Sequence, residues 1–134
     1  MGGETDLGTL LGAMSARMAD GVYVFATVPS GAVPQGLAPR MMFREAEGTT
    51  LILRREEAEA HGIAFEFPSR MITLNIHSSL EAVGFIAHIA GILAQHNMGV
   101  NPVSAYYHDH LFVPEDRAGD AMVVLEQIAR DNRG

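Results

Sequence analysis

The order of helix and strand patterns in the second half of the chain is the feature that most constrains its fold. Residues 71–77 alternate apolar and polar side chains and predict a strand. The residues that follow predict a helix over 79–97, a hairpin over 100–113 and a helix over 114–131. The apolar stripe expected for the last helix is Ala118, Ala121, Met122, Leu125 and Ile128. This β-α-β-β-α order is that of a ferredoxin-like unit without its last strand. We therefore expect an α+β fold, with an antiparallel sheet and helices on one face.

The first half of the chain predicts further elements of the same kind. Helical apolar spacing follows Asp6, which can cap the first turn of a helix. A β-branched and aromatic run follows Gly21, and the pair Glu47-Gly48 suits a tight turn. In chain order, we expect a helix over 6–19, a strand over 22–28, hairpin strands over 41–46 and 49–53, a short helix over 55–61 and a strand over 63–67.

Pro68 interrupts the pattern between the two halves. We therefore expect residues 1–68 to form a divergent N-terminal unit and residues 69–134 to form a C-terminal unit, with room for strands to interleave. Because the first half has strands to spare, we expect one strand from residues 22–67 to complete the second sheet.

Composition excludes several classes of protein. The 134 residues contain no cysteine and no lysine, which removes thiol nucleophiles, Schiff-base lysines and phosphate-loop lysines. A net charge of −7 disfavours binding to nucleic acid. No apolar run approaches the roughly 18 residues of a membrane helix. A hydrophobic content of 48% is ample for a closed core, so we expect a soluble cytoplasmic protein without a membrane partner.

The start of the helix over 79–97 attracts attention for two reasons. Ser78 and Glu81 have the spacing of a capping box, which predicts a helix start. Gly84 costs a helix up to about 1 kcal/mol relative to alanine, so either plain packing or the close approach of a neighbour or ligand would explain its presence.

The helix over 79–97 has two apolar faces. One face, expected to cover the sheet, carries Val83, Ile86, Ala87, Ala90, Leu93 and Ala94. A second apolar stripe, which predicts burial against another unit or subunit, carries Phe85, Ile89 and Ile92.

Two segments of the second half resemble the ACT domain family. They are Leu74-Asn-Ile-His-Ser-Ser-Leu-Glu-Ala-Val-Gly-Phe85 and Val100-Asn-Pro-Val-Ser-Ala-Tyr-Tyr-His-Asp-His-Leu-Phe-Val-Pro114. Phe43-Arg-Glu-Ala-Glu-Gly48 and Thr50-Leu-Ile-Leu53 are similar to a more divergent unit of the same kind. The chain resembles small bacterial proteins made of two ACT-like units, related to the regulatory domain of aspartate kinases, and the resemblance covers most of residues 7–131.

This resemblance implies a regulatory protein without catalytic residues or a cofactor. ACT units bind an amino acid between paired modules, using the turn after the first strand and the start of the second strand. The matching positions here are Ser78, Ser79, Val83, Gly84, Phe85, Asn101, Val103 and Ser104. The family's usual acidic residue before the glycine is not clearly matched, because Glu81 is the nearest acid. The implied partners are an amino acid, a second copy in a homodimer and an unidentified regulated protein.

Two other functions remain open. In one, the ACT-like units only dimerise and bind no ligand. In the other, His77, His108, Asp109 and His110 hold a metal ion in an enzyme, since imidazole and carboxylate groups both ligate zinc. We favour a tight turn supported by the aspartate as the interpretation of His108-Asp109-His110, and we expect no metal.

Overall fold

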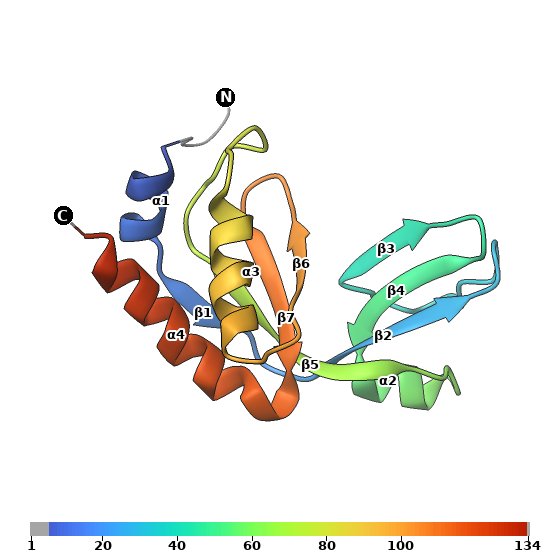
Figure 1. Cartoon of the computed structure of the whole chain (residues 1–134). Coiled ribbons are helices and arrows are strands. Elements are labelled where there is room, and N and C mark those ends of the chain that lie inside the picture. The colour runs from blue at the N-terminus through green and yellow to red at the C-terminus, as the bar shows by residue number, and fades with distance from the viewer. Residues whose placement is uncertain (1–5, 134) are drawn as a thin grey trace. The chain divides into compact units, whose positions relative to one another are not determined.

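A computed structural model describes residues 6–133, which fall into two compact units (Figure 1). Unit 1 comprises residues 6–20 together with residues 70–133, and unit 2 comprises Gly21–Ser69. Each unit has its own hydrophobic core. The chain therefore enters unit 1, leaves it to form unit 2, and returns.

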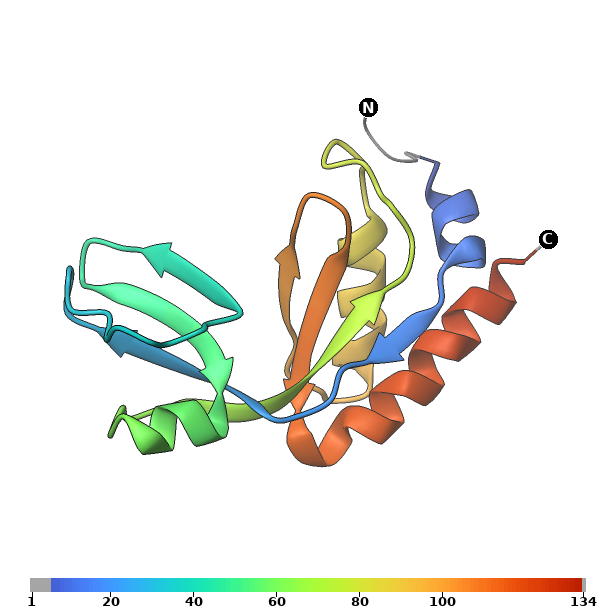
Figure 2. The same ribbon diagram turned by 180° about the vertical axis from the view of Figure 1, so that it is seen from behind.

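Unit 1 has the ferredoxin-like arrangement, with its helices on one face of the sheet. The strand order in this unit is β1-β5-β7-β6, and in Figure 2 the β6–β7 hairpin lies in front of α3. Its elements are α1 Leu7–Ala13, β1 Ala16–Met18, the last residues of β5 Glu66–Leu74, α3 Phe85–Gln95, β6 Asn101–Ser104, β7 Asp109–Pro114, the 3-10 helix η1 Glu115–Arg117 and α4 Ala118–Asp131. The predicted β-α-β-β-α order over 71–131 is confirmed.

The missing strand of unit 1 comes from the start of the chain. Ala16 pairs with Leu74, and Met18 pairs with Ile72, so β1 lies antiparallel to β5 at the edge of the sheet. The expectation of a helix throughout 6–19 is therefore wrong after Ala13, and so is the expectation that a strand from 22–67 completes this sheet. The step from Met14 to Met18 suggested a continuous helix, but Met14 is the C-cap of α1 and Met18 is the last residue of β1, which pairs with β5.

The first helix is capped as predicted. Asp6 is the N-cap of α1, and its carboxylate accepts hydrogen bonds from the amide of Thr9 at 2.9 Å and from the hydroxyl of Thr9 at 2.7 Å. The hydroxyl bond, supported by the amide bond, holds the pKa of the Asp6 carboxyl below its usual value.

The core of unit 1 is formed by α1, α3 and α4 against the sheet. The apolar stripe predicted for α4 is confirmed, because Ala118, Ala121, Leu125 and Ile128 are all buried. From the other elements, the core includes Leu10, Leu11, Met14, Ile72, Leu74, Phe85, Ile89, Leu93, Leu111 and Val113.

The structure corrects the predicted faces of the central helix. Phe85, Ile89 and Leu93 are the buried residues of α3, so most of the stripe expected to meet another unit or subunit instead faces the core. Val83 precedes the helix and is 85% exposed. Val83 was misplaced because α3 begins at Phe85, and the core-facing side was misplaced because Phe85, Ile89 and Leu93, each four residues apart, form the buried face in place of the alanine-rich one.

Unit 2 repeats the sheet order with the single helix α2, whereas unit 1 has the three α-helices α1, α3 and α4. Its strand order is β3-β4-β2-β5, formed by β2 Tyr23–Val28, β3 Met41–Arg44, β4 Thr49–Arg54 and the first residues of β5, with α2 Arg55–Ala60 leading into β5. Residues 29–40 connect β2 to β3 without a helix. The strand over 22–28, the hairpin around Glu47-Gly48 and the short helix after 55 are confirmed.

The strands expected over 63–67 and 71–77 form the single strand β5, which passes through Pro68. Tyr23 pairs with Ser69 whereas Phe25 pairs with Glu66, so β5 has one more residue than β2 between these pairs. Phe67 adopts a φ of 57° within this bulge. A bulge tolerates proline because the ladder is already interrupted there, which is why Pro68 does not end the strand.

No helix within residues 6–133 combines the length and apolar character needed to span a bilayer.

A glycine in α1 sets how closely this helix approaches the end of α4. A Cβ atom added at Gly12 would lie 2.6 Å from the backbone oxygen of Asn132, whereas one added at Gly91 in α3 would meet nothing within 4 Å. We expect Gly12→Ala to lower the free energy of unfolding by about 1–2 kcal/mol, because the gain in helix propensity is smaller than the clash. The matched change Gly91→Ala should raise it by about 0.5–1 kcal/mol. Urea denaturation measures both, and equal effects would contradict the close approach.

Candidate ligand-binding site

The loop between β5 and α3 ends in a backbone conformation that suits glycine. Gly84 is the N-cap of α3, with φ 91° and no side-chain hydrogen bond to the helix. The first amides of a helix have no acceptor within it, and they point along its axis with partial positive charge. The 11-residue α3 therefore presents uncapped N–H groups at its start, a favourable position for an anion.

The predicted capping box is wrong, because Ser78 and Ser79 lie six or more residues before the helix. The Ser78 hydroxyl donates to Oδ2 of Asp109 at 3.1 Å, and Ser78 is only 8% exposed. The Ser79 hydroxyl accepts the amide hydrogen of Glu81 at 3.0 Å, which closes a turn within the loop. Ser78 thus joins the loop to the start of β7.

The central side chain of the site is Asp109, which is 5% exposed. It is the one buried acidic or basic side chain among residues 6–133. It begins β7, directly opposite Ser104 at the end of β6, and the two strands are joined by a tight turn in which the amide of Ala105 donates to the carbonyl of His108 at 3.0 Å. Burying a carboxylate is costly, so a buried carboxylate with one hydroxyl partner calls for a cationic group.

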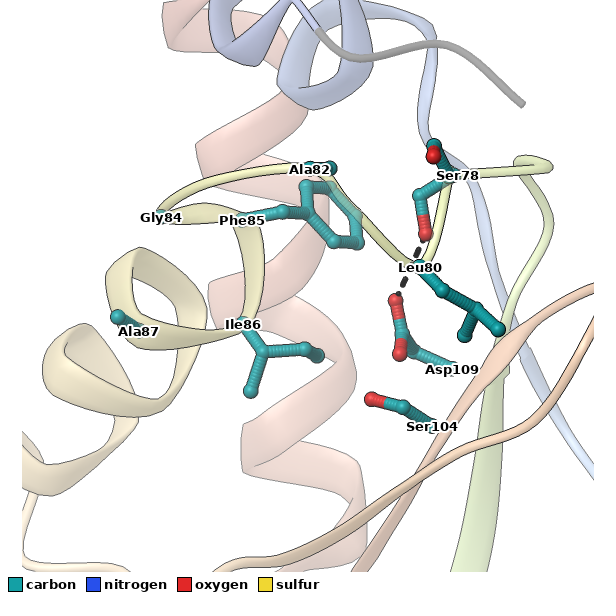
Figure 3. Close-up of a pocket in the computed structure, with 10 residues that line it drawn as sticks. Ser78, Leu80, Ala82, Gly84, Phe85, Ile86, Ala87, Ser104 and Asp109 are labelled. Carbon is teal, nitrogen blue, oxygen red and sulfur yellow. Dashed lines mark hydrogen bonds between the residues drawn. The ribbon is translucent and has the colours of Figure 1, made fainter. Parts of the chain in front are cut away.

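These groups line a cavity of about 160 Å³ at the start of α3, shown in Figure 3. Asp109, Ser104 and Ser78 lie on the strand side of the cavity, and Ile86 extends toward them from the first turn of the helix (Figure 3). The complete lining is Ser78, Ser79, Leu80, Ala82, Gly84, Phe85, Ile86, Ala87, Ser104 and Asp109.

The structure brings together five of the eight residues selected from the sequence. They are Ser78, Ser79, Gly84, Phe85 and Ser104. The cavity is not lined by Val83, Asn101 or Val103. Asn101 is the first residue of β6, at the opposite end from Ser104, and Val103 lies between them. Asp109, Leu80, Ala82, Ile86 and Ala87 were not selected. The signal that could have found Asp109 is its place at the start of a strand that pairs with Ser104.

An aromatic cluster lies next to the cavity. Tyr106 and Tyr107 are exposed in the β6–β7 turn, with ring centroids 4.9 Å apart. The His77 ring, beside Ser78, lies 6.2 Å from that of Tyr106 and 5.4 Å from that of Tyr107. Both tyrosines belong to the turn and not to either strand.

The histidines do not assemble a metal site within the described part of the chain. No group of three His, Asp or Glu side chains among residues 6–133 is arranged to hold an ion. His110 contacts the Thr73 hydroxyl through Nδ1 at 2.9 Å, and its ring lies 6.3 Å from that of His108.

Two other hollows lack a buried carboxylate beside a helix N-terminus. One, of about 250 Å³, lies beside α4 in unit 1, and its charged residues Glu126, Arg130 and Arg133 are exposed. The other, of about 380 Å³, lies in unit 2 beside β2, and its single charged residue, Glu66, is exposed. Of these three hollows, the cavity at the start of α3 alone pairs a buried carboxylate with a helix N-terminus.

The backbone of Gly84 gives a direct test of the loop geometry. An added Cβ has room, since its nearest contact is a carbon of Leu7 at 3.7 Å, but a φ of 91° is strained for alanine. We expect Gly84→Ala to lower the free energy of unfolding by about 1–2 kcal/mol. Gly119→Ala, in α4 with open space around it, should instead be stabilising. Chemical denaturation of both variants is the measurement, and an unchanged Gly84→Ala variant would mean that the loop adopts another conformation.

Comparison with known proteins identifies the family. An ACT domain family model matches residues 2–70, and a second ACT domain model matches residues 66–127. A solved protein of unknown function from Vibrio cholerae, described as a possible transport protein, is 42% identical, with a TM-score of 0.83 over 92% of this chain and 95% of that chain. No curated protein matches.

Aspartate kinases provide more distant structural neighbours. The regulatory subunit of aspartate kinase from Thermus thermophilus has a TM-score of 0.62 at 10% identity, over 84% of this chain and 95% of that chain. Aspartate kinase from Clostridium acetobutylicum has a TM-score of 0.61 at 8% identity, over 88% of this chain and 34% of that chain. Identities this low show a shared fold alone.

The family matches and the fold agree with one another. ACT domains are regulatory rather than catalytic, so the two family matches support a regulatory, ligand-binding role. Because the first model alone matches just over half of the chain and the second matches most of the remainder, this protein belongs to the ACT domain family.

Proposed function

We propose that the cavity at the start of α3 binds a free α-amino acid and that the protein thereby regulates a partner. The observation that carries this proposal is the buried carboxylate of Asp109 in the wall of a cavity that also includes the first turn of α3. The Asp109 carboxylate favours a cation, and the free amides in the first turn of α3 favour an anion. An α-amino acid carries both charges on adjacent atoms.

The two ends of the amino acid have different partners in this proposal. Its carboxylate accepts hydrogen bonds from the backbone amides of the first turn of α3, as anions do at helix N-termini. Its ammonium group lies against Asp109 and forms a charge-assisted hydrogen bond. The hydroxyl of Ser104, opposite Asp109 on β6, is a further donor and acceptor for either end.

A ligand of a single charge fits this cavity less well. Phosphate or a dicarboxylate would meet the uncompensated negative charge of Asp109, whereas an amine without a carboxylate would leave the helix amides unsatisfied. The cavity therefore favours a zwitterion over an anion and over a cation.

Regulation follows if the ligand binds one arrangement of the protein better than another. Leu80 and Val83, in the loop beside the cavity, are 66% and 85% exposed. Exposed apolar side chains of this kind favour a contact surface. In this proposal the loop meets a second copy in a homodimer or the regulated protein, and the ligand shifts the population of arrangements by its difference in affinity.

A thermal-shift screen against the twenty amino acids tests the proposal. A ligand at 100 times its dissociation constant stabilises the folded state by about 2.7 kcal/mol, a readily measured rise in Tm. The chain has no tryptophan and three tyrosines, two of which lie in the aromatic cluster, so tyrosine fluorescence should report the same binding. If no amino acid changes either signal, the proposal fails. Light scattering with and without the ligand tests the homodimer.

A further inference from the structure

The charges in the cavity restrict the side chain of the ligand. Asp109 is the single ionisable residue of the lining, and none of the nine arginines contributes to it. If Asp109 binds the α-ammonium group, a lysine or arginine side chain has no second carboxylate to meet. An aspartate or glutamate side chain has no guanidinium partner. A charged side chain of either kind, held against the lining, would have no partner of opposite charge there, which is unfavourable.

The polar groups of the lining are largely occupied. The Ser78 hydroxyl donates to Asp109, and the Ser79 hydroxyl accepts from the amide of Glu81. The remainder of the lining, apart from Ser104, is apolar: Leu80, Ala82, Gly84, Phe85, Ile86 and Ala87. In Figure 3, Ile86 faces the space beside Asp109 and Ser104, and Leu80 lies on the other side of Asp109. An aliphatic side chain of the ligand would displace water from Ile86.

The cavity volume restricts the size of the ligand. It is about 160 Å³. An engineered protein cavity of about 150 Å³ holds benzene, a molecule of about six non-hydrogen atoms. Because this cavity is open to solvent, it can accommodate a somewhat larger molecule, of about eight or nine such atoms, as in valine, leucine or isoleucine. Phenylalanine, tyrosine and tryptophan exceed this size.

We propose that the ligand is an amino acid with a small, uncharged aliphatic side chain, with valine as the representative, and that Ile86 determines this specificity. The inference rests on the proposed function and names its ligand class. Alanine leaves apolar surface uncovered and binds more weakly, by about fourfold for each missing methylene. Threonine, which has nearly the shape of valine, is disfavoured because its hydroxyl meets apolar side chains, and selectivity of up to about a hundredfold is typical of such pockets.

Titration calorimetry of the full chain with a panel of amino acids tests the inference. The panel is valine, isoleucine, leucine, alanine, threonine, aspartate, lysine and phenylalanine. The expected result is strongest binding by valine, isoleucine or leucine, with threonine weaker than valine and no measurable binding of aspartate, lysine or phenylalanine. Strongest binding by a charged or aromatic amino acid, abolished in Asp109→Asn, would overturn the ligand class while leaving the proposed function in place. Failure of every amino acid to bind would remove both.

A change in the size of the cavity provides the second test. Ile86→Ala should enlarge the space beside Asp109, so that binding of phenylalanine relative to valine rises by about fourfold for each methylene removed. Ile92→Ala is the matched control, because Ile92 is also partly buried against the core on α3 but does not line the cavity. An unchanged order of ligands in Ile86→Ala, or the same change in Ile92→Ala, would contradict the role of Ile86.

Discussion

Removal of residues 1–20 is expected to abolish the cooperative folding of unit 1. The deletion removes Leu10, Leu11 and Met14, all buried in the core, together with the edge strand β1. Each large apolar side chain contributes about 1.5–3 kcal/mol through burial, so the three contribute roughly 5–9 kcal/mol. This is comparable with the entire stability of a typical domain. Circular dichroism during thermal unfolding and the dispersion of amide signals in NMR spectra measure the loss.

A circular permutant tests whether unit 1 needs residues 6–20 at the start of the chain or needs only their presence. In the permutant, residues 6–20 follow residue 134 through a flexible linker of about ten residues. The connection is feasible because Arg133 donates to the carbonyl of Gly12 at 3.1 Å, so the end of the chain lies beside α1. The permutant should recover the cooperative transition. A truncated chain with the Tm of the full chain would show that β1 and α1 are not integral to the unit.

This edge strand also shows why part of the fold was beyond sequence reasoning. The order of elements over 71–131 and the apolar stripe of α4 depend on local periodicity, and both were predicted correctly. A strand of three residues has too little local pattern to be recognised, and the apolar spacing before it suggested a longer helix. Its existence depends on the space beside β5, a tertiary requirement that propensity does not contain.

The site was predicted in part for a similar reason. Ser78, Gly84 and Ser104 could be selected because they belong to segments that resemble the family. Asp109 was interpreted as a turn residue because the hairpin was centred on residues 108–109, whereas the turn is formed by residues 105–108. This change in register brings Asp109 into β7 and opposite Ser104. A register depends on pairing across the sheet, which one strand alone does not specify.

Replacement of Asp109 by asparagine is expected to have opposite effects on ligand binding and on stability. The variant keeps the shape of the side chain and an oxygen that can accept from Ser78. Loss of one partner of a buried charge pair typically costs 2–5 kcal/mol, so affinity for the amino acid should fall by about thirtyfold or more. Without ligand, the variant should be at least as stable as the parent, because a buried carboxylate with a single hydroxyl partner is costly.

Asp116→Asn is the matched control, since it makes the same change of charge at an exposed position in η1. It should alter neither stability nor affinity by more than a small amount. If Asp109→Asn is instead less stable than the parent and binds the amino acid equally well, the carboxylate has a structural role and the proposed contact with the ammonium group is excluded.

A ligand that lacks the ammonium group isolates that contact. The α-hydroxy acid corresponding to the amino acid keeps the carboxylate and the side chain but has no charge to place against Asp109. The parent should therefore bind it much more weakly than the amino acid, and this difference should shrink in Asp109→Asn. The four affinities form a double-mutant cycle, whose coupling energy measures the contact between ligand and carboxylate apart from any general weakening of the site. A coupling energy near zero would show that Asp109 does not contact the ammonium group, even if Asp109→Asn and the loss of the ammonium group each weaken binding.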